Sequence, residues 1–185
     1  KSAAGNEFSK LGITVIDADL VAKEAASKNS TAYKNIVDHF GNDILDDFEN
    51  IDRKKLRDII FSKPSQKEIL ESFLHPVIKE NITNQILSSK SDYTIIMVPL
   101  IFETNSMNQY QRILVVDCDE ELQISRAIKR DNSNKEDIQK ILNSQASREE
   151  RLSIADEVIL NNSSIEFLKQ EVLKVHKIYM DLVNE

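Results

Sequence analysis

The apolar run at residues 93–102 constrains the fold of this chain more than any other feature. It reads Tyr-Thr-Ile-Ile-Met-Val-Pro-Leu-Ile-Phe and has an acidic residue on either side. A near-continuous apolar strand is typical of a parallel sheet that helices cover on both faces. Pro99 has no N–H to give to a neighbouring strand, so we expect the strand to end near it. Glu103 then follows at the carboxyl edge of the sheet.

Helical and buried-strand patterns alternate along the rest of the chain. Further strands are predicted at 13–16, 112–117 and 158–160. Helices are predicted at 3–10, 20–27, 32–40, 53–61, 66–87, 120–130, 134–144, 148–154 and 165–183, with Pro76 interrupting the fifth. Strands that alternate with helices predict a three-layer α/β fold with a parallel sheet. No apolar run approaches the length of a membrane span.

Composition narrows the class of protein. The 185 residues fit a single domain with a substantial core. The net charge of −7 argues against binding of a nucleic acid polymer. Cys118 is the single cysteine and cannot form an internal disulfide, which fits a cytoplasmic protein. His39 and His176 have no companions at metal-ligand spacing, so we expect no zinc site.

Two carboxylates follow the first predicted strand. Ligands of open α/β sheets bind at the carboxyl ends of the strands, where Asp17 and Asp19 would lie. Residues two apart in an extended segment point to the same side, so both carboxylates could face one crevice. The structural alternative is that Asp19 caps a helix that begins at Leu20.

The first two residues match the end of a phosphate-binding loop. Lys1-Ser2 corresponds to the last two residues of G-x-x-x-x-G-K-[ST], the point where the helix of that motif begins. On this interpretation we expect the natural protein to carry the strand and glycines of the loop before Lys1. The alternative is an ordinary frayed terminus.

These segments together resemble the dephospho-CoA kinase family. The resemblance covers Lys1 to about Asn162 and lies in the number and order of its landmarks. They are Lys1-Ser2, Phe8-x-x-Leu11-Gly12-Ile13, Val15-Ile16-Asp17-Ala18-Asp19, Leu74-His75-Pro76, Val98-Pro99-Leu100-Ile101-Phe102-Glu103, Leu114-Val115-Val116-Asp117, Arg126 to Arg130-Asp131, Gln145-Ala146-Ser147-Arg148-Glu149-Glu150-Arg151-Leu152 and Ala155-Asp156.

The resemblance implies a P-loop kinase fold and a specific reaction. The fold would hold a five-stranded parallel sheet whose first strand lies upstream of residue 1. One domain, 1–185, would contain a helical acceptor-binding insertion at 22–90 and a helical lid at 126–152. The reaction would be phosphorylation of the ribose 3′-hydroxyl of dephospho-CoA by ATP with Mg²⁺, the last step of coenzyme A biosynthesis.

On the ATP side, the resemblance assigns a role to each matching residue. Lys1 would reach the β- and γ-phosphates, and the Ser2 hydroxyl would bind Mg²⁺. Ala3 departs from the family, which usually has Thr there, and this removes one phosphate contact. Arg130 and Arg148 would grip phosphate oxygens as part of the lid, and Asn161 and Asn162 would line the adenine site. Arg126 and Arg151 are further cations of interest.

On the acceptor side, Asp19 would deprotonate the acceptor hydroxyl or hold the metal through a water molecule. Asp17 would support that metal site or cap the strand. The residues expected to contact the acceptor are Asp17, Asp19, His75, Pro99, Leu100 and Glu103.

Structural alternatives remain open for most of these residues. Arg148 and Arg151 could pair with Glu149 and Glu150 on a helix surface. Glu103 could sit at a helix N-terminus, and the two asparagines could form a plain turn. For the whole chain, the alternatives are another nucleoside monophosphate-type kinase or a non-catalytic nucleotide-binding protein.

Overall fold

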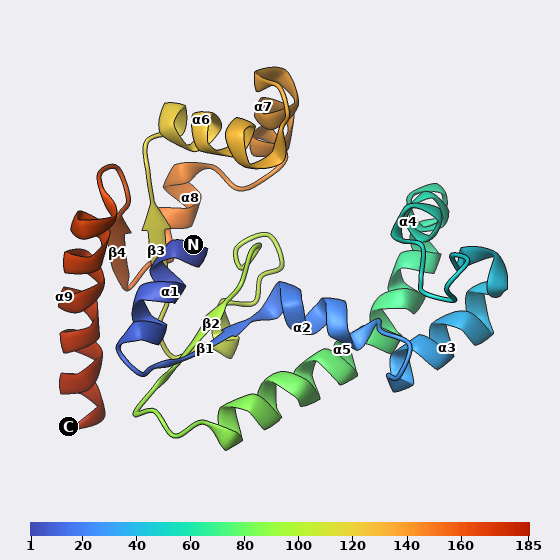
Figure 1. Ribbon diagram of the computed structural model, residues 1–185, viewed down its shortest axis with the longest axis horizontal. Coiled ribbons are helices and arrows are strands. Elements are labelled where there is room, and N and C mark those ends of the chain that lie inside the picture. Colours follow the sequence, from blue (N-terminus) through green and yellow to red (C-terminus); the bar gives the residue numbers. More distant parts are fainter. The chain divides into compact units, whose positions relative to one another are not determined.

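The computed structural model describes residues 1–185, which divide into two compact units. Unit 1 comprises Lys1–Val15 and Ser91–Glu185, and unit 2 comprises Ile16–Lys90. The strands are β1 (Thr14–Asp17), β2 (Thr94–Met97), β3 (Leu114–Asp117) and β4 (Glu157–Leu160) (Figure 1). The helices are α1 (Ser2–Lys10), α2 (Ala18–Ala25), α3 (Thr31–Phe40), α4 (Arg53–Ser62), α5 (Pro64–Ser88), α6 (Glu120–Asp131), α7 (Lys135–Asn143), α8 (Arg148–Ser153) and α9 (Ile165–Val183), with short 3-10 turns η1 (Asn42–Ile44) and η2 (Met107–Gln109).

The strands form two pairs, and the α/β class predicted from the sequence is confirmed. β1 pairs with β2, and β3 pairs with β4. The second pair is parallel, with Leu114 opposite Glu157 and Asp117 opposite Leu160. A five-stranded sheet is not seen. The described residues form four strands, so no fifth strand is present to hydrogen bond to both pairs and join them.

The predicted strand at 93–102 is too long. β2 ends at Met97, and the apolar residues after Pro99 form turns instead. The Thr104 N–H donates to the Leu100 carbonyl at 3.0 Å, and Asn105 adopts a positive φ of 49°. The expectation that the strand stops near Pro99 is therefore confirmed, and the apolar residues beyond it lie in a loop.

Unit 1 has a core built on α1 and α9. Helix α1 packs against α9 and β2, and α9 also packs against β4 (Figure 1). The buried residues of this core are Ala4, Phe8, Ile13, Ile159, Leu168, Val172, Val175 and Tyr179. Between α1 and β1 the chain turns at Gly12, whose φ of +83° lies in the region that favours glycine.

Unit 2 is a helical bundle with its own core. Helices α2, α3 and α4 all pack against α5 (Figure 1). The buried core residues are Ala32, Ile36, Ile44, Leu56 and Leu70. Helix α5 begins at Pro64, a favoured first helical residue. The predicted interruption at Pro76 is not seen, since α5 continues through this residue although an interior proline removes one N–H donor and crowds the carbonyl four residues earlier.

Candidate active site

A buried carboxylate at the end of β3 forms an ion pair with an arginine of α8. Asp117 is 6% exposed and is the last residue of the strand. The Arg148 Nε atom lies 3.1 and 2.9 Å from its two carboxylate oxygens, and Nη2 lies 2.5 Å from Oδ2. The hydrogen bond to Asp117 raises the pKa of Arg148, so this guanidinium is firmly charged.

The local sequence fixes Arg148 at the first position of α8. The Ser147 hydroxyl accepts a hydrogen bond from the Glu150 N–H, and the Glu150 carboxylate accepts one from the Ser147 N–H. This reciprocal capping box starts the helix at Arg148. Arg148 and Arg151 therefore do not pair with Glu149 and Glu150, because Arg148 binds Asp117 and Arg151 donates to the Ala146 carbonyl at 2.5 Å.

The two asparagines after β4 connect the carboxyl ends of β3 and β4. The Asn161 N–H donates to the Asp117 carbonyl at 2.8 Å, and the Asn162 Oδ1 accepts from the Asp119 N–H at 2.8 Å. Arg126 donates from Nη1 to the Asn161 carbonyl at 2.6 Å. The two asparagines therefore tie together the segments that follow β3 and β4, and their contact with adenine stays a prediction.

Positive charge gathers at the start of α1. Lys1 and Ser2 are exposed, with Ser2 as the first residue of the helix. Arg126 and Arg130 lie close enough to residue 1 for their positive charges to act there. A helix N-terminus beside two arginines is an environment that attracts anions.

Arg130 and Glu103 make contacts within unit 1 that the sequence does not reveal. Arg130 donates to the adjacent Asp131 carboxylate at 2.7 and 2.6 Å, which raises the pKa of Arg130. The Glu103 Oε1 accepts from the Ala146 N–H at 2.8 Å and so anchors the residues before α8. Glu103 therefore acts as a loop anchor, not as a residue at a helix N-terminus.

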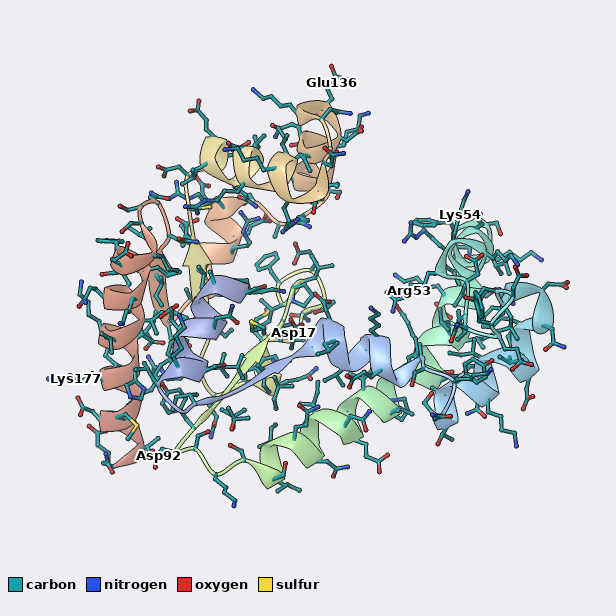
Figure 2. The ribbon with its side chains drawn as sticks, viewed as in Figure 1. Asp17, Arg53, Lys54, Asp92, Glu136 and Lys177 are labelled. Carbon is teal, nitrogen blue, oxygen red and sulfur yellow. The ribbon has the colours of Figure 1, made fainter.

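In unit 2, the helix after β1 begins earlier than predicted and has a different cap. Asp17 ends β1 (Figure 2). Its Oδ1 accepts hydrogen bonds from the N–H groups of Asp19 at 3.0 Å and Leu20 at 3.4 Å. The N-cap is thus Asp17, which is extended with φ −93° and ψ 107°, and not Asp19. Asp19 lies in the first helical turn, so the two carboxylates do not belong to one extended segment.

The remaining predicted residues are spread over both units. His75 is exposed on α5, and Pro99 and Leu100 are exposed after β2. His39 contacts Gln66 Oε1 through Nε2 at 2.9 Å, and His176 contacts the Tyr93 hydroxyl through Nδ1 at 2.6 Å. No group of three His, Cys, Asp or Glu residues is placed to hold a metal ion.

Sequence reasoning did not single out Asp117 as a site residue. The signal was present, because Asp117 closes a buried strand as Asp17 does, and carboxyl ends of strands are where ligands bind. What the sequence hides is its partner, Arg148, which lies 31 positions away.

Comparison with known proteins identifies the family. The family model for dephospho-CoA kinase matches residues 1–166. The dephospho-CoA kinase of Gamma-proteobacterium EBAC31A08 is 54% identical over 185 residues, covering all of this chain and 94% of the relative. That of Idiomarina loihiensis is 46% identical over 180 residues, covering 97% of this chain and 89% of the relative.

Solved structures agree with the family model. Dephospho-CoA kinase from Campylobacter jejuni matches with a TM-score of 0.68 and 31% identity, over 95% of this chain and 89% of that one. The protein TT1252 from Thermus thermophilus has a TM-score of 0.82 at 22% identity, over 96% of this chain and 90% of that one, and shows the fold alone. No helix here combines the length and apolar character that crossing a membrane requires. The chain therefore belongs to the dephospho-CoA kinase family.

Proposed function

We propose that this chain transfers the γ-phosphoryl group of ATP to the ribose 3′-hydroxyl of dephospho-CoA, giving coenzyme A and ADP. The observation that carries the proposal is the family match over residues 1–166, which includes every residue assigned to the site. This reaction is the last step of coenzyme A biosynthesis, and we place it in the cytoplasm.

The ATP side of the proposal rests on positive charge in unit 1. Phosphoryl transfer depends mainly on positioning and on neutralising phosphate charge. We assign Lys1 to the β- and γ-phosphates and Arg148 to the transferring phosphoryl group. We also assign Arg130 to the phosphates. It would release Asp131 to bind them, since such an exposed ion pair is weak. Asn161 and Asn162 are assigned to the adenine end.

The Ser2 hydroxyl fits the proposed Mg²⁺ ligand. It is exposed on the first residue of α1 and is an oxygen donor, the type that Mg²⁺ prefers. Mg²⁺ usually keeps several waters and takes its other ligands from substrate phosphates, so a single protein oxygen suffices. Bound Mg²⁺ would neutralise charge on the β- and γ-phosphates.

We assign Asp19 as the base that accepts the proton of the acceptor hydroxyl. Asp19 is exposed in the first turn of α2, the helix that follows the carboxyl end of β1, where ligands of α/β sheets bind. His75, Pro99, Leu100 and Glu103 are assigned to acceptor binding, together with the helical segment 22–90, and residues 126–152 to the lid.

A coupled ADP-release assay tests the proposal. With Mg²⁺-ATP and dephospho-CoA, we expect turnover that requires dephospho-CoA and that falls about 10²–10⁴-fold in Asp19→Asn, the range for a lost general base. Glu166→Gln, an exposed carboxylate in the first turn of α9 and outside every segment assigned to the site, serves as the control and should leave turnover unchanged.

Three other outcomes would reject part of the proposal. Unchanged turnover in Asp19→Asn would remove the role of Asp19 and keep the kinase. Turnover with AMP instead of dephospho-CoA would place the protein among the nucleoside monophosphate-type kinases. Thermal stabilisation by ATP with no turnover of any acceptor would leave a nucleotide-binding protein.

A further inference from the structure

Both oxygens of the Asp117 carboxylate accept hydrogen bonds from one arginine, Arg148. The side chain of Asp117 is 6% exposed, while that of Arg148 is 48% exposed. The Asp117 backbone is itself fixed, since it pairs with Leu160 in the β3–β4 register and its carbonyl accepts the Asn161 N–H. A rigid, buried carboxylate thus holds a guanidinium that reaches solvent.

The geometry of the pair leaves three of the five N–H donors of the guanidinium for another acceptor. Arginine has five N–H donors, and here Nε and one donor of Nη2 point at Asp117. The edge formed by Nη1 and the second Nη2 donor remains for another acceptor. A phosphate can bind two parallel donors of this kind, so Asp117 and a phosphoryl group can hold two adjacent edges of one guanidinium.

We propose that Asp117 is a positioning residue for phosphoryl transfer, which fixes Arg148 with its open edge available to the transferring phosphoryl group. This inference rests on the proposed function, in which Arg148 acts on ATP. The capping box fixes the backbone of Arg148, and the Asp117 carboxylate fixes its guanidinium. The side chain therefore loses little conformational freedom when it binds the phosphate. Asp117 acts only through Arg148.

The same strand pair provides a matched control at its opposite end. Arg112 donates from Nε to Glu157 Oε1 at 3.0 Å, and the Tyr179 hydroxyl donates to Glu157 Oε2 at 2.8 Å. The Glu157 side chain is 9% exposed, nearly as buried as Asp117. Glu157 opens β4 at the amino end of the pair, where α/β sheets do not bind their ligands.

The inference predicts a specific split between kcat and KM. Asp117→Asn replaces a charged, two-oxygen acceptor with a neutral, one-oxygen acceptor, so Arg148 is held less firmly. We expect kcat to fall about tenfold. Loss of the negative charge beside the phosphates leaves the site more positive, so KM for ATP should not rise. KM for dephospho-CoA should stay the same.

A double-mutant cycle separates positioning from a structural role. Four proteins are compared in the ADP-release assay: wild type, Asp117→Asn, Arg148→Ala and the double variant. Since Asp117 acts through Arg148, Asp117→Asn should cost nothing further once Arg148 is alanine. Glu157→Gln should lower the unfolding temperature about as much as Asp117→Asn and leave kcat within about twofold.

Several results would overturn the inference. One is a loss of kcat on Asp117→Asn that is as large in the Arg148→Ala background as in wild type. The others are a loss of kcat in Glu157→Gln as large as that in Asp117→Asn, and an unchanged kcat in Asp117→Asn. If Asp117→Asn does not fold, Asp117→Glu keeps the charge and moves it by one methylene, and an unchanged kcat there would count against positioning. A wild-type protein that does not turn over dephospho-CoA would instead reject the proposed function.

Discussion

At the scale of single residues, Asp17 and Asp19 differ in what they do for the fold. Asp17 satisfies two N–H groups at the start of α2. We predict that Asp17→Ala lowers the free energy of unfolding by about 1 kcal/mol, the usual cost of losing an N-cap side chain. Asp17→Asn should be nearly neutral, because Asn is as good an N-cap as Asp. Urea unfolding followed by circular dichroism measures both.

Activity provides the contrasting measurement for the same variants. We expect Asp17→Asn to retain most of the turnover that Asp19→Asn loses. A loss in Asp17→Asn as large as that in Asp19→Asn would show that the Asp17 carboxylate has a chemical role beyond the cap.

Residue types at strand ends were predictable, but their partners were not. The pattern of buried strands placed Asp17 within one residue of its observed position, the last residue of β1, and correctly placed Glu103 beyond the end of β2. The contacts that define these side chains depend on tertiary structure, such as Glu103 with Ala146 across 43 positions. The alternative that Asp19 caps the helix is wrong because an N-cap is identified from where the helix starts, and that start lies two residues earlier than predicted.

At the scale of elements, helices were easier to predict than strands. Helix α9 was predicted with its observed bounds, Ile165–Val183, because Ser164 provides a local cap signal. Hydrophobicity predicts a strand at 93–102, but the observed strand covers only Thr94–Met97. A strand extends only as far as an adjacent strand forms backbone hydrogen bonds with it. An apolar run in the sequence does not show where that adjacent strand ends.

The packing of α1 on the strands gives an element-scale prediction for Gly5. A Cβ atom added to Gly5 would lie 2.6 Å from the Met97 Sδ and 3.3 Å from the Val15 Cγ1. Alanine is favoured over glycine within a helix by about 1 kcal/mol, but overpacking costs about 1–3 kcal/mol. We therefore predict that Gly5→Ala lowers the free energy of unfolding in urea.

A second background tests the cause of that loss. In Met97→Ala the sulfur is gone, so adding Gly5→Ala should be neutral or stabilising, because helix propensity then dominates. If Gly5→Ala destabilises both backgrounds equally, contact with Met97 is not the reason.

At the scale of the whole molecule, each unit has a separate core, and this arrangement was only partly predictable. The alternation of helices and strands predicted the α/β class, and the number and order of the sequence landmarks indicated the family. The core of unit 1 combines α1 with α9, from the two ends of the chain. Periodicity identifies which face of a helix is apolar but does not identify what covers it, so this pairing needed the structure.

The tyrosines of the unit 1 core make stability depend on alkaline pH. Burial raises the pKa of Tyr179, and its hydrogen bond to Glu157 raises it further. Burial, with the charge of Asp92, also raises the pKa of Tyr93. In the unfolded chain a tyrosine loses its proton near pH 10. Above that pH the unfolded state binds fewer protons than the folded state, so stability falls as pH rises.

We predict that the urea midpoint is insensitive to tyrosine ionisation up to about pH 9 and declines above about pH 10. Tyr179 contributes at most about 1.4 kcal/mol per pH unit to that decline. Tyr179→Phe should therefore give a flatter decline, although it starts from a lower stability at pH 7 because a hydrogen bond is lost. Tyr33→Phe is the control, since the Tyr33 hydroxyl donates to the Glu49 carbonyl in unit 2 and lies outside both cores. An equal decline above pH 10 in wild type and Tyr179→Phe would mean that other groups, such as lysines, control alkaline unfolding.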